Sequence, residues 1–307
     1  MQILRAASRR SQLAMTQTQW VINQLMSTHQ GLGVDVVPIV TKGDRILDVA
    51  LSKVGGKGLF VSEIEETLLA GEADFAVHSL KDVPGLLAPH LGLVAMPLRE
   101  DPRDALVSRS GAGFLALPQG AKIGTSSLRR ITQLKAQRPD LEFVPIRGNI
   151  DTRLKKLESE GLDAIVLAAA GLKRMGWADR ITELLAPEVC LPAIGQGILG
   201  IEARVDDREV LALLAVLHDS VTSMAATAER ALLTRLDGGC QVPMAGYAEV
   251  LADETIRMRA MVADPNGTER LFAESTDRDA VALGTRLAEQ LLEQGASRIL
   301  ESTATTG

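Results

Sequence analysis

Apolar residues follow two alternating patterns along the first half of the chain, and each pattern predicts one kind of element. Short apolar runs at 2–7, 34–40 and 74–77 are typical of buried strands. Between these runs, apolar residues spaced three to four apart indicate amphipathic helices at 11–26 and 59–70. Strands that alternate with helices favour βα units arranged around a mostly parallel sheet.

This order of segments occurs twice. "AKIGTSSLRRITQL" at 121–134 repeats the strand, the Ser-Arg turn and the helix of "ILRAASRRSQLAM" at 3–15. Two further resemblances follow in the same order, "EFVPIRGN" with "DVVPIVTKGD" and "EGLDAIVLAA" with "GEADFAVHS". Three pairs of similar segments in the same order predict two similar α/β lobes.

Beyond Pro192 the pattern changes. Segments 207–218 and 219–236 have helical periodicity, whereas "TIRMRAMVAD" and "TERLFAES" alternate with period two, as half-buried strands do. A helical segment at 277–294 closes the chain. Neighbouring strands with flanking helices predict a small α+β domain in this part.

Length and cysteine content narrow the class of protein. A chain of 307 residues suggests two or three domains. Two cysteines exclude a disulfide scaffold and fit a reducing compartment. The N-terminal segment lacks an apolar run of signal-peptide length, and no later stretch approaches the span of a membrane helix. We therefore expect a cytoplasmic protein with no membrane partner.

Charge is distributed unevenly. The net charge is −6, yet residues 121–156 contain nine Lys/Arg against three Asp/Glu. Aromatic residues make up only 3% of the chain, which leaves few rings on which bases could stack. The basic segment therefore indicates a small anionic ligand rather than a nucleic acid. A solvated basic face is the alternative.

The motif "GTSSLRR" at 124–130 gives this ligand a candidate site. A strand that ends at Gly124 brings three hydroxyls to a helix N-terminus, where backbone N–H groups and the helix dipole favour an anion. Arg129 and Arg130 add planar donors that suit carboxylates or phosphates. An ordinary N-cap accounts for one of the hydroxyls.

The same arrangement occurs elsewhere in the chain. "SRRS" at 8–11 places arginines and serines at the corresponding turn of the first lobe, and Arg147 and Arg153 flank the second turn of the other lobe. Several arginines from two lobes would suit a ligand with several carboxylates.

Asp82 in "HSLKDVP" follows the strand at 74–77, at the edge where open α/β sheets bind ligands. Lys81 and Asp82 could form a turn ion pair of little consequence. Alternatively, Asp82 is an acid placed to stabilise a cation. At about 4 Å that attraction is worth about 4 kcal/mol at an effective dielectric of 20, against about 1 kcal/mol in water.

Two glycine-rich motifs are rejected on context. "VGGKGLF" lacks the Gly-Lys-Ser/Thr ending of a phosphate-binding loop. "GQGILG" at 195–200 has dinucleotide-binding spacing, but Pro192 precedes it and a strand rather than a helix follows. The four histidines and two cysteines show no metal-ligand spacing, so we expect no metal.

The two cysteines differ in their surroundings. Cys190 in "PEVCLP" has apolar neighbours, as buried cysteines do, and we interpret it as structural or incidental. Cys240 in "LDGGCQVPMAG" follows two glycines and precedes Pro243, which is the pattern of a turn. A thiol in such a segment is either incidental or a point of attachment.

Nine segments together resemble one family. They are "SRRSQLA", "KVGGKGLF", "HSLKDVP", "EDPRDA", "GTSSLRR", "RGNIDTRL", "LAAAGLKR", "GQG" and "GGCQVP". In order and spacing they resemble porphobilinogen deaminases over residues 5–243. Gln12 and "VPMAG" depart from the family pattern without changing a charged position.

The resemblance implies an α/β fold with two periplasmic-binding-protein-like doubly wound lobes and a smaller α+β C-terminal domain with an antiparallel sheet. Lobe one would comprise 1–97 and 198–215, and lobe two 103–191. Residues 220–307 would form the domain that carries the cysteine loop. In this family the lobes enclose an arginine-lined cleft.

It also implies a monomeric transferase, hydroxymethylbilane synthase, that works on the small molecule porphobilinogen. Such an enzyme deaminates four porphobilinogens and joins them head to tail onto a dipyrromethane primer held by a cysteine thioether. It then releases the linear tetrapyrrole hydroxymethylbilane.

The site residues follow from the same resemblance. Cys240 matches the attachment cysteine, and Asp82 matches the catalytic aspartate. Lys57 lies in the segment that resembles the active-site lid, and Gln196 in the matching segment between the lobes. The positions that match carboxylate-binding residues are Arg9, Ser11, Lys81, Thr125, Ser127, Arg129, Arg130, Arg147 and Arg153.

A second class of protein remains open at this point. A two-lobed protein that binds or senses a small anion without turnover would account for the repeat and the basic segment. It would leave Cys240 and Asp82 without a role, and the chain shows no convincing helix-turn-helix. Release of ammonia from porphobilinogen discriminates the two classes.

Overall fold

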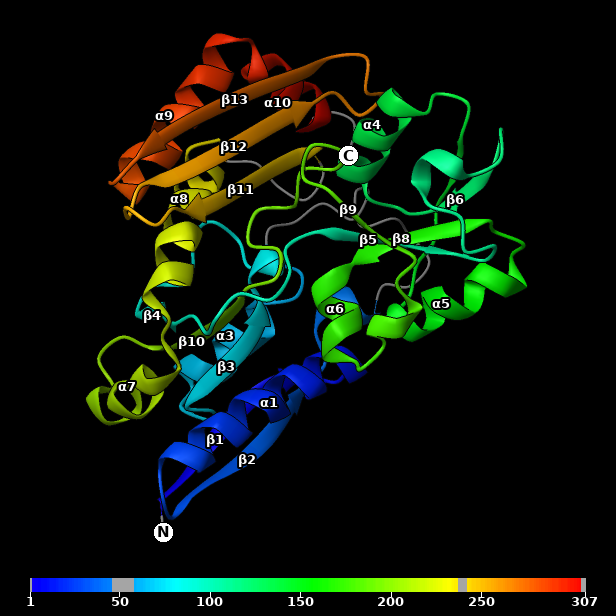
Figure 1. The fold of residues 1–307 in the computed structure, drawn as a ribbon. Helices are drawn as coiled ribbons and strands as arrows, with labels where there is room; N and C mark the ends of the chain where they lie inside the picture. The colour runs from blue at the N-terminus through cyan, green and yellow to red at the C-terminus, as the bar shows by residue number, and fades with distance from the viewer. Residues whose placement is uncertain (1, 46–57, 237–241, 305–307) are drawn as a thin grey trace. The chain divides into compact units, whose positions relative to one another are not determined.

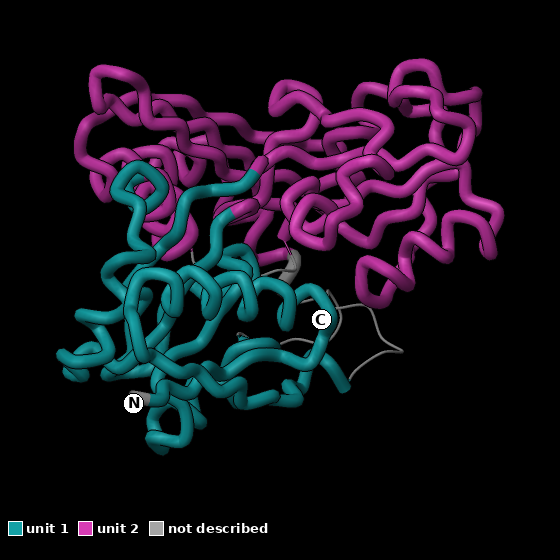
Figure 2. The backbone as a smooth tube through the Cα atoms, turned by 60° about the horizontal axis from the view of Figure 1, so that its bottom comes forward, with its two compact units in different colours: residues 1–46, 56–100, 198–224 teal, residues 47–55, 101–197, 225–307 magenta. Residues whose placement is uncertain are grey.

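A computed structural model describes residues 2–45, 58–236 and 242–304 of the chain (Figure 1). These residues divide into two compact units, drawn in different colours in Figure 2. Unit 1 comprises the described residues up to Glu100 together with Ile198–Met224, and unit 2 comprises Asp101–Gly197 with the described residues from Ala225 onward.

Unit 1 is built on a five-stranded sheet in the order β2-β1-β3-β10-β4. The first three strands in this order are parallel, and β10 is antiparallel to both of its neighbours. The strands are β1 (Gln2–Arg9), β2 (Leu32–Ile39), β3 (Phe75–Ser79), β4 (Leu91–Ala95) and β10 (Leu199–Arg204).

Helices cover both faces of this sheet because alternate strand residues are apolar on each side. Leu4 and Phe75 pack with Val21 and Leu25 of one helix, whereas Ala76 packs with residues of another on the opposite face. The helical elements are α1 (Gln12–Thr28), α2 (Lys42–Arg45), α3 (Ser62–Leu69), η2 (Leu80–Asp82), α7 (Arg208–Leu214) and η5 (Ala215–Leu217).

Unit 2 contains a second five-stranded sheet in the order β7-β6-β8-β5-β9. Strands β7, β6 and β8 are parallel, and β5 is antiparallel to β8 and β9. The strands are β5 (Asp104–Ser108), β6 (Lys122–Gly124), β7 (Glu142–Val144), β8 (Ala164–Ala168) and β9 (Glu183–Leu185). The helical elements are η3 (Phe114–Ala116), α4 (Leu128–Gln137), α5 (Ile150–Ser159), α6 (Ala169–Arg174) and η4 (Ala178–Arg180).

The two sheets have equivalent strand orders. In each, the strand next to the edge pairs in parallel with two neighbours, and an antiparallel strand occupies the fourth place. Each sheet has a separate apolar core on either face. The predicted repeat and the doubly wound fold class are confirmed.

The last part of unit 2 is an antiparallel sheet of three strands, β11 (Met244–Val250), β12 (Ile256–Ala263) and β13 (Arg270–Asp277). Helix α9 (Ala280–Glu293) contacts β12 and β13, and α10 (Ala296–Ala304) contacts β12 (Figure 1). Within the described residues, no single helix is long and apolar enough to cross a membrane. One pair, α7–η5 with α8 (Ser220–Leu236), meets those criteria only when joined across a bend.

Two predicted helices begin three residues later than expected, and a third helix was missed. The helix expected at 59–70 begins at Ser62, and α10 follows the helix that was expected to close the chain. The helix expected at 277–294 begins at Ala280, because β13 continues to Asp277 and the side chain of Asp279 accepts a hydrogen bond from the N–H of Ala282 at 3.0 Å. This bond satisfies one of the free N–H groups of the first helical turn, so it fixes where the helix starts.

Helix α9 approaches α8 closely at Gly284. A Cβ atom at this position would lie 2.1 Å from the carbonyl oxygen of Ala228 and 2.9 Å from the backbone nitrogen of Leu232. We therefore expect Gly284→Ala to lower the free energy of unfolding by about 3 kcal/mol, because the helices must separate. Urea unfolding followed by circular dichroism measures this change. Ala282→Val, on the exposed side of α9, is the control and should have little effect.

Candidate functional site

A small cavity in unit 1, of about 50 Å³, lies at the carboxyl ends of two neighbouring parallel strands. Arg9 ends β1, Ser79 ends β3, and Asp82 ends the 3₁₀ turn that follows β3. Ser11, which caps α1, also lines the cavity. This is the edge at which open α/β sheets bind ligands, so the location predicted for Asp82 is confirmed.

Arg9 is held on two sides. Its Nη2 lies 2.5 Å from Oδ1 of Asp44, and its guanidinium carbon lies 4.1 Å from the ring centroid of Phe60. Burial alone would raise the pKa of Asp44, but the hydrogen bonds from Arg9 and Thr41 lower that pKa below its ordinary value. Asp44 therefore stays ionised and fixes the guanidinium at the rim of the cavity.

The carboxylate of Asp82 is half-buried and has neither a hydrogen-bond nor an ion-pair partner among the described residues. The turn ion pair with Lys81 that we considered from the sequence is not formed. A carboxylate without a protein partner is available to a ligand, because none of its acceptor positions is already occupied.

A buried pair that the sequence did not indicate lies behind this cavity. Nε2 of His78 is 2.8 Å from Oε2 of Glu202, and both side chains are almost fully buried. Gln17 and Ser79 exchange hydrogen bonds of 3.1 and 3.2 Å beside them. Local sequence patterns could not reveal this pair, because the two residues are 124 positions apart.

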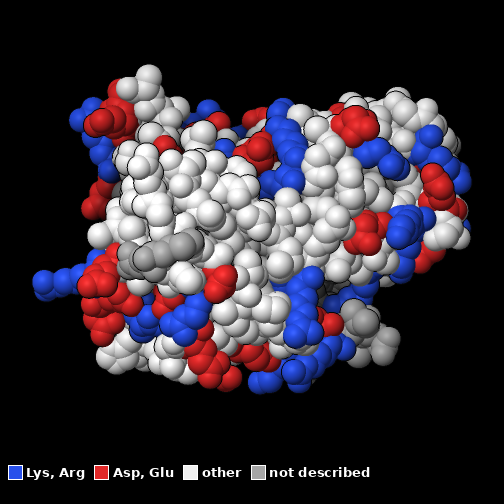
Figure 3. Space-filling view, turned by 90° about the horizontal axis from the view of Figure 1, so that it is seen from below, with Lys and Arg blue, Asp and Glu red and all other residues white. Residues whose placement is uncertain are grey.

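In unit 2, Arg129 and Arg130 share one buried carboxylate. Nη1 of Arg129 lies 2.8 Å from Oδ2 of Asp104, and Nη2 of Arg130 lies 2.8 Å from Oδ1. The Asp104 side chain is fully buried, which alone would raise its pKa, but the two guanidiniums hold that pKa well below its ordinary value. Arg129 and Arg130 are therefore buried, so the alternative of a solvated basic face does not hold at these two positions. On the molecular face drawn in Figure 3, positive and negative side chains are interspersed.

Cys190 and Gln196 belong to the same cluster. The Cys190 thiol lies 3.3 Å from Oδ2 of Asp104, and burial together with that negative charge raises the pKa of the thiol to about 12. Nε2 of Gln196 donates to Oδ1 of Asp104 at 3.0 Å and to the carbonyl oxygen of Pro102 at 2.7 Å. Cys190 is buried, and it lies in an ionic cluster rather than in purely apolar surroundings.

The turn before α4 differs from the expected N-cap. Ser127 occupies the N-cap position, but its side chain makes no capping hydrogen bond. Thr125 Oγ1 instead accepts from the N–H of Ser127 at 3.2 Å, and Ser126 donates to the carbonyl oxygen of Ile146 at 2.7 Å. The Ser127 hydroxyl is therefore not used for capping, and the expectation that an N-cap would account for one of the three hydroxyls is wrong.

The arginines of the second turn have different surroundings. Nε of Arg153 donates to the carbonyl oxygen of Gly148 at 2.8 Å. Nη1 of Arg147 is buried and has no hydrogen-bond partner among the described residues. A buried donor without an acceptor is costly, so this position favours a ligand oxygen.

Two predicted site residues, Lys57 and Cys240, lie outside the described residues. Within the ranges that the structure covers, His, Cys, Asp and Glu form no group of three that could hold a metal ion.

Comparison with known proteins covers almost the entire chain. Residues 4–212 match the family model of the porphobilinogen deaminase dipyrromethane cofactor binding domain, and residues 223–293 match that of the porphobilinogen deaminase C-terminal domain. The porphobilinogen deaminase of Syntrophotalea carbinolica is 56% identical over 97% of this chain and 95% of its own length. That of Bacillus subtilis is 52% identical over 98% and 96%.

Likeness to solved structures is much weaker. An arginine-specific periplasmic binding protein from Salmonella typhimurium shares 14% identity over 73% of this chain and 94% of its own, with a TM-score of 0.37. No functional conclusion follows from a likeness of this size.

The sequence matches define the chain as an enzyme that uses a dipyrromethane cofactor. It belongs to the porphobilinogen deaminase family.

The described residues fit such a cofactor. Each of its pyrroles carries an acetate and a propionate, so it presents several carboxylates. The unpartnered Nη1 of Arg147 is a donor suited to one of them. The two guanidiniums beside Asp104 carry one positive charge more than that carboxylate neutralises, which also favours an anion.

The buried cluster predicts how stability depends on pH. We expect Asp104→Asn to lower the free energy of unfolding at pH 7 by about 3–5 kcal/mol, because two arginines lose their buried counter-charge. The pKa of Asp104 is lower in the folded protein, so its stabilisation is complete above its ordinary pKa and is lost as the pH falls below about 4.

Urea unfolding of both proteins between pH 7 and pH 3 measures this difference, which should narrow toward acid. Glu289→Gln, in the exposed pair with Arg235, is the control and should change little. Equal stability of Asp104→Asn and the wild type at pH 7 would contradict this account.

Proposed function

We propose that this chain deaminates four porphobilinogen molecules, joins them head to tail on a dipyrromethane primer held by Cys240, and releases hydroxymethylbilane. The observation that carries the proposal is Asp82, a half-buried carboxylate in the cavity of unit 1 that has no partner in the described part of the chain. The matches to porphobilinogen deaminases over nearly the whole chain support it.

Asp82 acts on the nitrogen side of the substrate pyrrole. When the aminomethyl group leaves as ammonia, positive charge develops over the pyrrole and its N–H. A carboxylate that accepts a hydrogen bond from this N–H stabilises the cation and can take up or return a proton. Arg9 and Ser11 line the same cavity and bind a substrate carboxylate.

The dipyrromethane supplies the free pyrrole carbon at which chain growth begins. Residues of unit 2 hold its carboxylates. Arg147 offers a buried donor without a partner among the residues that the structure covers, and the Ser127 hydroxyl is not used in capping. Thr125 and Arg153 of unit 2, together with Lys81 of unit 1, are assigned to carboxylate binding on the family resemblance. The covalent link keeps intermediates bound, so each addition is intramolecular.

Arg129 and Arg130 contribute through charge. Because they share one carboxylate, the cluster around Asp104 has an excess of one positive charge in a buried setting. Gln196 orients Asp104 and thereby the two guanidiniums. This arrangement attracts anionic carboxylates while the hydrogen bonds of the cluster keep the arginines in place.

Three further parts of the proposal concern organisation. Residues 1–97 with 198–215, 103–191 and 220–307 act as three domains, and Lys57 belongs to a lid over the substrate. The enzyme works as a monomer in the cytoplasm, in keeping with its two cysteines. Sedimentation equilibrium tests the monomer.

Replacement of the catalytic carboxylate tests the chemical step. We expect Asp82→Asn to fold normally and to release ammonia from porphobilinogen about 100-fold more slowly, because the amide carries no negative charge. Asp35→Asn, an exposed carboxylate of β2, should retain full activity. A near-normal rate for Asp82→Asn would remove this residue from the mechanism.

The intact mass of the protein tests the covalent primer. We expect the wild type to carry an excess mass of two linked pyrrole units, or to acquire it with porphobilinogen, and Cys240→Ala to carry none. Arg147→Leu should acquire less of the primer, because one carboxylate loses its donor. If the wild type remains unmodified after porphobilinogen is added, the covalent mechanism fails and a two-lobed binding protein explains the fold better.

A further inference from the structure

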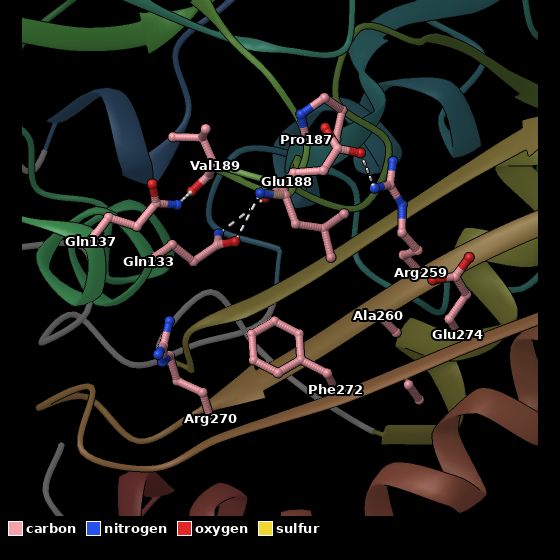
Figure 4. A pocket seen from close by; sticks show the side chains of 12 residues that line it. Gln133, Gln137, Pro187, Glu188, Val189, Arg259, Ala260, Arg270, Phe272 and Glu274 are labelled. Carbon is pink, nitrogen blue, oxygen red and sulfur yellow. Dashed lines mark hydrogen bonds and ion pairs between the residues drawn. The ribbon is translucent and has the colours of Figure 1, made fainter. Parts of the chain in front are cut away.

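Unit 2 contains a larger cavity that the proposed reaction does not use. It has a volume of about 380 Å³ and is lined by β12, β13, α4 and the segment 187–191 (Figure 4). A cavity of this volume is within the range of small-molecule sites. Its lining contains none of the residues assigned to substrate or cofactor.

One wall of the cavity is apolar and aromatic. Phe272 on β13 is 51% exposed, and its ring stands in the centre of the view in Figure 4. Pro187 and Val189 also line the cavity and add apolar side chains to it. An exposed aromatic face in a concave site favours a planar ring as its occupant, because stacking removes both surfaces from water.

The charges around this wall favour an anion. The guanidinium carbon of Arg270 lies 5.9 Å from the Phe272 ring centroid, and Arg270 has no acidic partner among the described residues. The two acids of the lining are already neutralised: Glu188 lies 2.5 Å from Arg259, and Glu274 lies 2.6 Å from Arg257. Arg270 therefore contributes an uncompensated positive charge.

Arg259 adds an unused donor. Its side chain is 16% exposed, and its Nε is buried without a hydrogen-bond partner in the described part of the chain. Its terminal nitrogens pair with Glu188 and, at 3.7 Å, with Glu249. Arg259 and Arg270 are two candidate donors for a ligand carboxylate, and they lie on opposite sides of the Phe272 ring (Figure 4).

We propose that this cavity is a second ligand site, for a small planar aromatic molecule that carries a carboxylate. The ring stacks on Phe272 and the carboxylate pairs with Arg270. The site is distinct from the one that holds porphobilinogen and goes beyond the proposed function.

The opposite wall connects the cavity to the buried arginine cluster. The carbonyl oxygen of Leu191 accepts from Nε2 of Gln133 at 3.2 Å and from Nη1 of Arg129 at 2.7 Å. The Leu191 N–H donates to Oε1 of Gln133 at 2.8 Å. A ligand that contacts Gln133 or Leu191 therefore touches a peptide to which Arg129 is hydrogen-bonded.

Isothermal titration calorimetry with 2-naphthoate as the probe tests the site. We expect one site per chain in the holoenzyme, and at least tenfold weaker binding in both Phe272→Ala and Arg270→Gln. The neutral alcohol 2-naphthylmethanol should bind the wild type at least tenfold more weakly than the carboxylate does, because it lacks the charge that pairs with Arg270.

Two controls match these variants. Leu251→Ala removes an exposed apolar side chain outside the cavity, and Arg180→Gln removes an exposed positive charge outside it. Both should bind 2-naphthoate like the wild type. Absence of binding to the wild type, or undiminished binding to Phe272→Ala and Arg270→Gln, would refute the proposal.

The calorimetric readout does not depend on turnover. Displacement of 2-naphthoate by porphobilinogen in Asp82→Asn, at the concentration that saturates the catalytic site, would place the probe there and overturn the second site. If 2-naphthoate still binds when porphobilinogen saturates the catalytic site, the result supports the second site. Failure of the proposed reaction would leave the binding of 2-naphthoate to Phe272 and Arg270 unchanged.

Discussion

The hydrogen-bonded ion cluster of Asp104 with Arg129 and Arg130 connects several parts of unit 2. Asp104 begins β5, the arginines lie in the first turn of α4, and the cluster also includes Cys190 and Gln196 from the segment that follows β9. Without Asp104, two guanidiniums would remain buried without a counter-charge. The cluster therefore fixes the start of α4 and the arginines that act on anionic ligands.

The cluster also shows that different side chains hold the structure in place and face the ligand. Buried arginines are held in one geometry by Asp104, whereas Arg147 retains a donor that no residue within the described ranges accepts from. In unit 1 the division is similar, because Asp44 fixes Arg9 and Asp82 is left without a partner among the described residues. In both units, the groups best suited to a ligand lie beside ion pairs that hold the backbone and neighbouring side chains in place.

Local patterns in the sequence predicted the elements and the two α/β lobes, because alternating apolar runs reflect burial directly. They also placed Asp82 at the end of its strand. They could not identify Asp104 as the partner of two arginines 25 and 26 residues away, nor pair His78 with Glu202 across 124 residues. Such contacts depend on strand order, which apolar periodicity does not encode. The cavity around Phe272 was missed for the same reason, since β13 and the segment 187–191 are distant in sequence.

The position of β10 has a consequence for how the chain is made. Residues 199–204 form the strand between β3 and β4, although both neighbours are complete by residue 95. During synthesis the sheet of unit 1 must wait for more than 100 further residues, while all five strands of the first sheet of unit 2 lie between 104 and 185. All strands of the β7-β6-β8-β5-β9 sheet are therefore synthesised before β10 can complete the sheet of unit 1. Until then, β3 and β4 have unpaired edges.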